Sequence, residues 1–113
     1  MKYYHNPRCS KSRQGLELLE GHGKKPEIIE YLKEPPDEKT LRDIVKKLGT
    51  GAESLVRKSE DIYKEKYRDR KMTEDDWIKA MVKHPILIER PILIGEKKAV
   101  IGRPSENLLN IKE

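Results

Sequence analysis

Apolar residues recur with a helical spacing between Asp37 and Gly49, and this is the clearest pattern in the chain. The apolar positions fall at i, i+3, i+4 and i+7, which is one face of a helix; they are Leu41, Ile44, Val45 and Leu48. Asp37 is a good N-cap residue, and Gly49 is typical of the end of a helix. The pattern therefore predicts a helix between these two residues.

An earlier segment has a weaker helical pattern that begins at Ser10. Leu16 and Leu19 lie three residues apart and so share one face, while Gly21-His22-Gly23 provides a C-terminal stop. We expect the first helix of the chain here, directly after residues 6–9.

The middle of the chain predicts a third helix and some shorter ones. Thr73 and Asp76 are spaced as a variant of the capping box, an apolar run follows them, and His84-Pro85 ends the segment. The apolar residues of the stretch 52–70 are instead spread among dense charge, which favours short helices with a solvated face.

Four short runs are typical of β-strands because they are rich in β-branched and aromatic residues; they are residues 2–5, 27–32, 91–95 and 99–102. A helix separates the first two runs, so they are expected to pair in parallel. Three charged residues separate the last two, which predicts a hairpin. Ser105 is expected to cap a final helix.

The predicted order is strand, helix, strand, several helices, then two strands and a helix. This order fits an α/β fold of the thioredoxin-like or glutaredoxin-like type, with a helical insertion between the βαβ and ββα halves. A chain of 113 residues is long enough for one core, so we expect a single domain spanning residues 1–113.

Composition narrows the classes of function. The chain has 25 Lys and Arg against 20 Asp and Glu, and this net charge of +5 comes from interspersed signs. Such a pattern suits a small anionic substrate better than nucleic acid. No apolar run approaches the length of a membrane span, and the N-terminus lacks the apolar region of a secretory signal. We expect a cytoplasmic monomer with no nucleic-acid or membrane partner.

Cys9 is the residue with the clearest chemical potential, because it follows the first predicted strand and directly precedes the first helix. Free N–H groups and the positive end of the helix dipole converge there and favour a thiolate. Positive charge from Arg8, Lys11 and Arg13 is expected to reinforce this effect. A buried, inert thiol is the alternative. Ser12 occupies the second position of a C-x-x-C pair, so no internal disulfide can form.

The histidines suggest no metal centre. His5 stands at the end of the first strand and is a secondary site candidate, because it could hydrogen-bond near the thiol and tune its ionisation. A purely structural role is the alternative. Cys9, His5, His22 and His84 have no metal-ligand spacing, so we predict no metal site.

The segment around Cys9 resembles a known family. His5-Asn6-Pro7-Arg8-Cys9-Ser10-Lys11-Ser12-Arg13 is similar to the H-N-P-x-C-x-x-S-R signature of glutaredoxin-dependent arsenate reductases of the ArsC type. Other segments resemble that family in order and spacing, namely residues 31–36, 55–58, 84–91 and 102–106. The resemblance covers nearly the whole chain and is greatest to the short, arsenate-reductase-related branch.

The resemblance implies an activity and a set of site residues. Cys9 would be the nucleophile that attacks arsenate or a related oxyanion, and Arg57, Arg90 and Arg103 would bind that oxyanion. Pro91 matches the position of a cis-proline beside the reactive cysteine. Secondary candidates from the matched motifs are His5, Ser12, Arg13 and Pro91.

The same resemblance implies the source of electrons. Glutathione would be a co-substrate, glutaredoxin would be the protein partner, and the enzyme would hold no tightly bound cofactor.

Two other classes of protein stay open. Spx-like transcriptional regulators, which bind RNA polymerase, share the implied fold, although they often carry the C-x-x-C pair that Ser12 removes here. In a monothiol, glutathione-dependent thiol-transfer protein, Cys9 would exchange disulfides without attacking arsenic.

Overall fold

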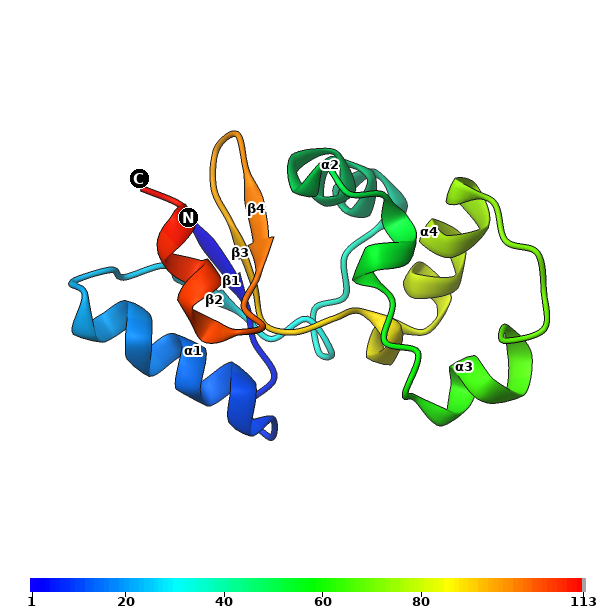
Figure 1. The fold of residues 1–113 in the computed structure, drawn as a ribbon, viewed down its shortest axis with the longest axis horizontal. Helices are drawn as coiled ribbons and strands as arrows, with labels where there is room; N and C mark the ends of the chain where they lie inside the picture. The colour runs from blue at the N-terminus through cyan, green and yellow to red at the C-terminus, as the bar shows by residue number, and fades with distance from the viewer. Residues whose placement is uncertain (113) are drawn as a thin grey trace. The chain divides into compact units, whose positions relative to one another are not determined.

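The computed structural model describes residues 1–112, in which four short strands form one sheet with the order β2-β1-β3-β4 (Figure 1). The strands are β1 (Lys2–Tyr4), β2 (Glu27–Ile29), β3 (Ile92–Ile94) and β4 (Ala99–Ile101). β1 pairs with β2 in parallel and with β3 antiparallel, and β3 and β4 form an antiparallel hairpin. The predicted parallel pair and hairpin are therefore confirmed.

Each strand is shorter than the run that predicted it. The second run ends early because the Lys33 N–H donates to the carbonyl of Glu30, 2.9 Å away, and so closes a turn. At the end of β1, one hydrogen bond to β2 continues past the last strand residue, from the His5 N–H to the carbonyl of Ile29 at 2.9 Å. β-Branched residues alone therefore overstate strand length.

The α-helices lie in the segments where the sequence predicts helices: α1 (Ser10–Gly21), α2 (Glu38–Leu48), the short α3 (Asp61–Lys66) and α4 (Glu74–Lys83). Asp37 caps α2 by accepting a hydrogen bond from the Thr40 N–H at 2.8 Å, and Gly49 ends it with a left-handed φ of 74°. Thr73 and Asp76 form the predicted capping box at the start of α4.

Short 3₁₀ helices complete the chain: η1 (Ala52–Leu55), η2 (Pro85–Leu87) and η3 (Ser105–Asn110). The prediction that Ser105 caps the last helix is wrong. Ser105 is the first residue inside η3, and Pro104 holds the N-cap position without a side-chain hydrogen bond. The Asn107 amide nearby instead donates to the carbonyl of Arg103 at 3.2 Å.

The chain divides into two units, of which the first joins Met1–Glu34 to the segment that begins at Arg90. This unit contains the sheet, and α1 packs against η3. Its core cluster lies on the sheet face that carries Tyr3 and Leu93, which are paired neighbours on β1 and β3. The other members come from α1, η3 and the chain that follows η3; they are Leu19, Leu108 and Ile111.

The buried face of α1 carries mostly small side chains. Ser12, Gly15 and Leu19 are its buried residues, so α1 presents a serine and a glycine where a leucine would be expected. A Cβ atom on Gly15 would lie 2.5 Å from the Tyr3 hydroxyl oxygen and 2.8 Å from Cδ1 of Leu108. The absence of a side chain at Gly15 therefore permits the close approach of α1 to β1 and η3.

The second unit, Pro35–Glu89, is the helical insertion expected between the two halves. α4 contacts α2, η1 and η2 and contributes Trp77, Ile78 and Met81 to the buried side chains. Tyr63 of α3 stacks on Trp77 with ring centroids 6.2 Å apart. These features confirm the α/β class and the inserted helices, while the expectation of one domain stays a prediction. Within residues 1–112, no helix is long and apolar enough to cross a membrane.

Substituting Gly15→Ala is expected to destabilise the protein by about 1–3 kcal/mol, because the added methyl group overlaps the Tyr3 hydroxyl and Leu108. Gly21→Ala is the matched control, since no atom lies within 4 Å of the added Cβ and alanine favours a helix. Denaturant unfolding of both variants checks this. Equal midpoints for Gly15→Ala and the unmodified protein would contradict the close packing.

Candidate active site

Cys9 is the N-cap residue of α1, at the end of the loop that follows β1. Its N–H donates to the carbonyl of Asn6 at 2.9 Å, and its carbonyl accepts from the Arg13 N–H at 3.1 Å, which starts the helix. The residue is partly exposed and its thiol is free. The predicted position of Cys9 between strand and helix is therefore confirmed.

Four groups from three segments approach the Cys9 sulfur. The backbone N–H groups of Ser12 and Lys11 and the side chain of Arg90 donate to it. Nη2 of Arg103 lies 3.5 Å from Sγ. Burial raises the pKa of the Cys9 thiol, but the hydrogen bonds and the charge of Arg90 outweigh it, and the pKa is lowered from its usual value. The site therefore favours a thiolate.

The cations that stabilise this thiolate are not the ones expected from the sequence. Arg8, Lys11 and Arg13 have exposed side chains, and Arg13 donates instead to the carbonyl of Pro7 at 2.8 Å. Lys11 contributes its backbone N–H. Arg90, distant in sequence, provides the charge.

Two arginines lie together at the ends of the β3–β4 hairpin. Nε of Arg103 donates to the carbonyl of Arg90 at 2.8 Å, so one arginine is held on the backbone of the other. Gly102 donates its N–H to the carbonyl of Pro91 at 2.8 Å, and a Cβ on Gly102 would lie 2.8 Å from Cγ of Pro91. Close backbone packing thus brings Arg90 and Arg103 to Cys9.

The Arg90–Pro91 peptide bond is cis, as the resemblance implied. The Arg103–Pro104 bond is also cis, which the sequence did not indicate. Asn107, which sequence reasoning missed, follows Pro104 and binds the carbonyls of Arg103 and Ile101 at 3.2 and 3.4 Å. An amide side chain near a helix start is too common a feature to have identified it.

Ser12 organises the other side of the site. Its hydroxyl accepts from the Asn6 N–H at 3.0 Å and shares a hydrogen bond of 2.7 Å with Nδ1 of His5. Its carbonyl accepts from the Tyr3 hydroxyl at 2.5 Å. Ser12 is fully buried, so each of these bonds replaces one with water. The sequence indicated Ser12 only as a secondary candidate and missed Tyr3 and Asn6.

His5 is mainly a neutral group at this site. Burial lowers the pKa of His5, and the charge of Arg13 lowers it further, against an opposing effect of Glu30. A neutral imidazole can accept a hydrogen bond from the Ser12 hydroxyl, and that leaves the hydroxyl oxygen to accept from Asn6. His5 therefore contacts Ser12, and its effect on Cys9 would pass through α1.

Arg57 belongs to the second unit, where two carboxylates hold it. Nη1 lies 2.7 Å from Oε1 of Glu89, and Nε lies 3.2 Å from Oε2 of Glu60. Burial alone would lower the pKa of Arg57, but these carboxylates raise it. The side chain is 15% exposed. Both carboxylates belong to the same unit as Arg57, whereas Arg90 and Arg103 belong to the unit that contains Cys9.

The described part of the chain contains no group of three His, Cys, Asp or Glu residues that could hold a metal ion. The histidines have other neighbours. Nδ1 of His22 lies 3.0 Å from the carbonyl of Leu18, and the ring of His84 stands edge-on to Tyr67.

Comparison with known proteins points to one family. The profile of the ArsC family matches residues 4–111. An uncharacterized protein of Escherichia coli K12, YfgD, is 50% identical over 113 residues, which cover 98% of this chain and 95% of that protein. An arsenate reductase of Neisseria meningitidis serogroup A is 46% identical over 110 residues, which cover 96% of this chain and 94% of that protein.

A solved structure agrees in fold as well as in sequence. The arsenate reductase from Vibrio cholerae superposes with a TM-score of 0.92 at 40% identity, and the match covers 99% of this chain and 98% of that one. This similarity includes both the sheet unit and the helical insertion.

The structure predicts that alkylation of Cys9 has a pH midpoint below the value of about 8.5 for a free thiol, because hydrogen bonds stabilise the thiolate. Arg90→Gln and Arg103→Gln should each move the midpoint up, toward the free thiol. Arg8→Gln removes an exposed charge and should leave it in place. Iodoacetamide reaction rates against pH distinguish the two groups, and an equal change in Arg8→Gln would contradict the assignment.

Proposed function

The chain belongs to the ArsC family, and from this we propose that it reduces arsenate to arsenite, with Cys9 as the nucleophile. The observation that carries the proposal is the Cys9 sulfur, with a lowered pKa and both Arg90 and Arg103 beside it. Arsenate is a tetrahedral oxyanion, and planar guanidinium groups match pairs of its oxygens. One place can therefore hold both the nucleophile and the anion.

In the first step, the Cys9 thiolate attacks arsenic and forms a sulfur–arsenic bond. One arsenate oxygen leaves as water after taking protons from solvent, and arsenic stays in the pentavalent state. Arg90 and Arg103 would stabilise the negative charge on the remaining oxygens during this attack. The backbone N–H groups of Ser12 and Lys11 stabilise the thiolate before the attack.

The electrons come from two thiols outside the chain. Glutathione replaces a second oxygen on arsenic, again with loss of water, and forms a second sulfur–arsenic bond. A glutaredoxin thiolate then attacks the glutathione sulfur. That bond to arsenic breaks, its electron pair reduces arsenic to the trivalent state, and a mixed disulfide of glutaredoxin and glutathione leaves. Water releases arsenite and restores Cys9.

This scheme requires no tightly bound cofactor, because glutathione is a co-substrate and the chain supplies one thiol. Among the arginines, Arg90 and Arg103 are supported by their position at Cys9. Arg57 is supported by its motif alone, and we include it as a third oxyanion ligand on that ground. We further propose that the protein acts as a monomer in the cytoplasm.

A second function has one observation in its favour. Cys9 is an activated thiol with no second cysteine in the chain, which is the arrangement of a monothiol that exchanges disulfides with glutathione. Such a protein would turn over glutathione mixed disulfides without arsenate. The Spx-like alternative has no comparable support.

Arsenate-dependent NADPH oxidation, coupled through glutathione, glutaredoxin and glutathione reductase, is expected to be saturable and to vanish in Cys9→Ser. Arg103→Ala should reduce kcat/KM for arsenate by about 10²-fold, because it removes a donor to the developing charge. Arg8→Ala is the exposed control. Turnover of a glutathione mixed disulfide without arsenate turnover would favour thiol transfer. The absence of both reactions would contradict both functions.

Arg57→Ala is expected to lower kcat/KM for arsenate and to reduce the free energy of unfolding by about 1–3 kcal/mol, since two charged hydrogen bonds are lost. Glu60→Gln keeps the arginine but weakens one of those bonds. The two roles separate if Glu60→Gln loses stability and keeps its kinetics. An equal kinetic loss in both variants would mean that Arg57 is purely structural.

A further inference from the structure

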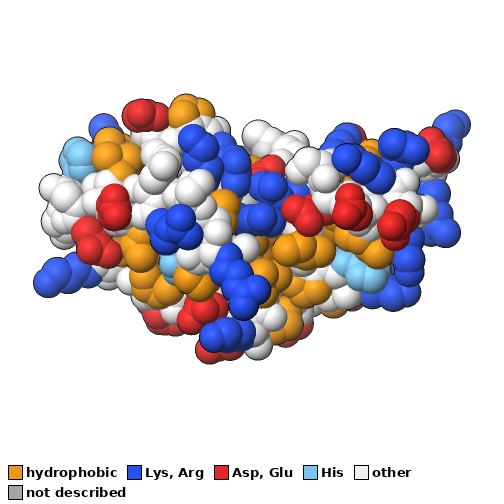
Figure 2. Space-filling model, turned by 90° about the horizontal axis from the view of Figure 1, so that it is seen from below, with side chains coloured by type: hydrophobic (Ala, Val, Ile, Leu, Met, Phe, Trp, Pro, Cys, Tyr) orange, Lys and Arg blue, Asp and Glu red, His pale blue; other side chains and the backbone are white. Residues whose placement is uncertain are grey.

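The second unit carries a strongly charged surface that the proposed reaction does not use. It extends over α3, the segment after it and the exposed side of α4, and we call it the basic surface. Seven cations line its two hollows: Lys64, Lys66, Arg68, Arg70, Lys71, Lys79 and Lys83. Three carboxylates accompany them, those of Glu65, Asp69 and Asp76. Figure 2 shows Lys and Arg gathered at the right-hand end of the view.

Within residues 1–112, the cations of the basic surface lack ion pairs, as do Lys39 and Lys46 of α2, whereas four other cations of the same unit have them. Those four bind carboxylates; they are Arg42, Lys47, Arg57 and Lys58. Among the described residues, none of the seven cations lies within ion-pairing distance of a carboxylate. Their charge is therefore available to an anionic partner.

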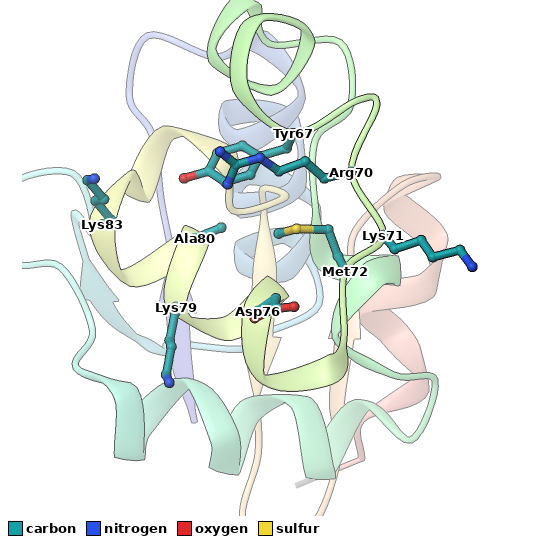
Figure 3. Close-up of a pocket in the computed structure, with 8 residues that line it drawn as sticks. All are labelled: Tyr67, Arg70, Lys71, Met72, Asp76, Lys79, Ala80 and Lys83. Atoms are coloured by element: carbon teal, nitrogen blue, oxygen red, sulfur yellow. The ribbon is translucent and has the colours of Figure 1, made fainter.

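The hollow between α4 and the preceding segment adds an apolar element to this charge. It has a volume of about 250 Å³, and its lining includes Tyr67, Met72 and Ala80. Figure 3 shows the Met72 side chain directed toward Ala80, with Tyr67 beside them. The Arg70 guanidinium lies 5.9 Å from the centre of the Tyr67 ring. An apolar floor therefore lies below a cationic rim.

A second hollow of about 490 Å³ continues from the first, since the two share Tyr67, Arg70 and Lys83. Lys64, Lys66 and Arg68 line its rim. Together the hollows form an extended groove rather than an isolated pocket, which suits a chain-like ligand better than a compact one.

We propose that the basic surface docks an acidic segment of a partner protein. One apolar side chain of that segment would enter the hollow formed by Tyr67, Met72 and Ala80, and its flanking carboxylates would face Arg70, Lys79 and Lys83. The interspersed carboxylates Glu65, Asp69 and Asp76 disfavour the closely spaced phosphates of nucleic acid, because like charges would face each other. The carboxylates of a flexible peptide are more widely spaced and can lie away from these three acidic residues.

The test uses the full-length protein and a fluorescein-labelled peptide in which a central leucine is flanked by Asp and Glu. Fluorescence anisotropy at low salt is expected to show saturable binding that weakens steeply as salt rises. Lys79→Glu combined with Lys83→Glu should reduce the association constant by about tenfold or more. Both residues are exposed, so folding should be retained, and circular dichroism checks this.

The matched control is Lys39→Glu combined with Lys46→Glu, which changes the net charge equally on exposed positions of α2. At an ionic strength of about 0.1 M it should change binding by less than about twofold, because neither residue lines the hollows and salt then screens charges beyond about 10 Å.

An equal loss in the α2 control would overturn the proposal, since net charge alone would then explain binding. Equally tight binding of single-stranded DNA or of vesicles containing phosphatidylserine would also overturn it in favour of that ligand. Absence of peptide binding at low salt would reject docking of an acidic segment. Arsenate turnover of the Lys79 and Lys83 variant is expected to be unchanged, so this test is independent of the proposed function.

Discussion

The structure of the site depends on the burial of Ser12 at the start of α1. Its hydroxyl, carbonyl and N–H groups each have a partner, and these partners belong to β1, to the loop after it and to Cys9. A buried polar residue with every group satisfied fixes its surroundings strongly, since any displacement leaves a group without a partner. The position of the α1 N-terminus relative to the sheet, and hence the environment of the thiol, follows from this one residue.

Close backbone contact has the same effect on the opposite side of the site. Gly15 and Gly102 both leave room for Leu108, and Gly102 also leaves room for Pro91. The hairpin and η3 can therefore approach α1 closely enough for Arg103 to reach Cys9. The positive charge near the Cys9 sulfur thus depends on packing, because the close backbone contacts at Gly15 and Gly102 position Arg90 and Arg103.

Local features of the fold could be predicted from the sequence, and features that depend on distant segments could not. The helix of α2 has its own cap, stop and apolar stripe within residues 37–49, so the pattern alone was sufficient. The sequence correctly placed Cys9 at the start of a helix, where its thiol ionises readily. It assigned the stabilising positive charge to residues that are only neighbours of Cys9 in sequence. Arg90, which lies just before the β3–β4 hairpin, contacts Cys9, and only the family resemblance had indicated this role. The role of Gly15 in close packing could not be predicted, because a glycine in a sequence does not indicate which residues pack against it.

The single cysteine has a consequence for oxidative damage. A thiolate at a partly exposed position is readily oxidised by peroxide to a sulfenic acid. That species is usually protected by condensation with a nearby thiol, but this chain contains no second cysteine. Its recovery depends on thiols from solution arriving before further oxidation to the irreversible sulfinic and sulfonic acids. The survival of the protein under oxidative stress is therefore set by the thiol concentration of its surroundings.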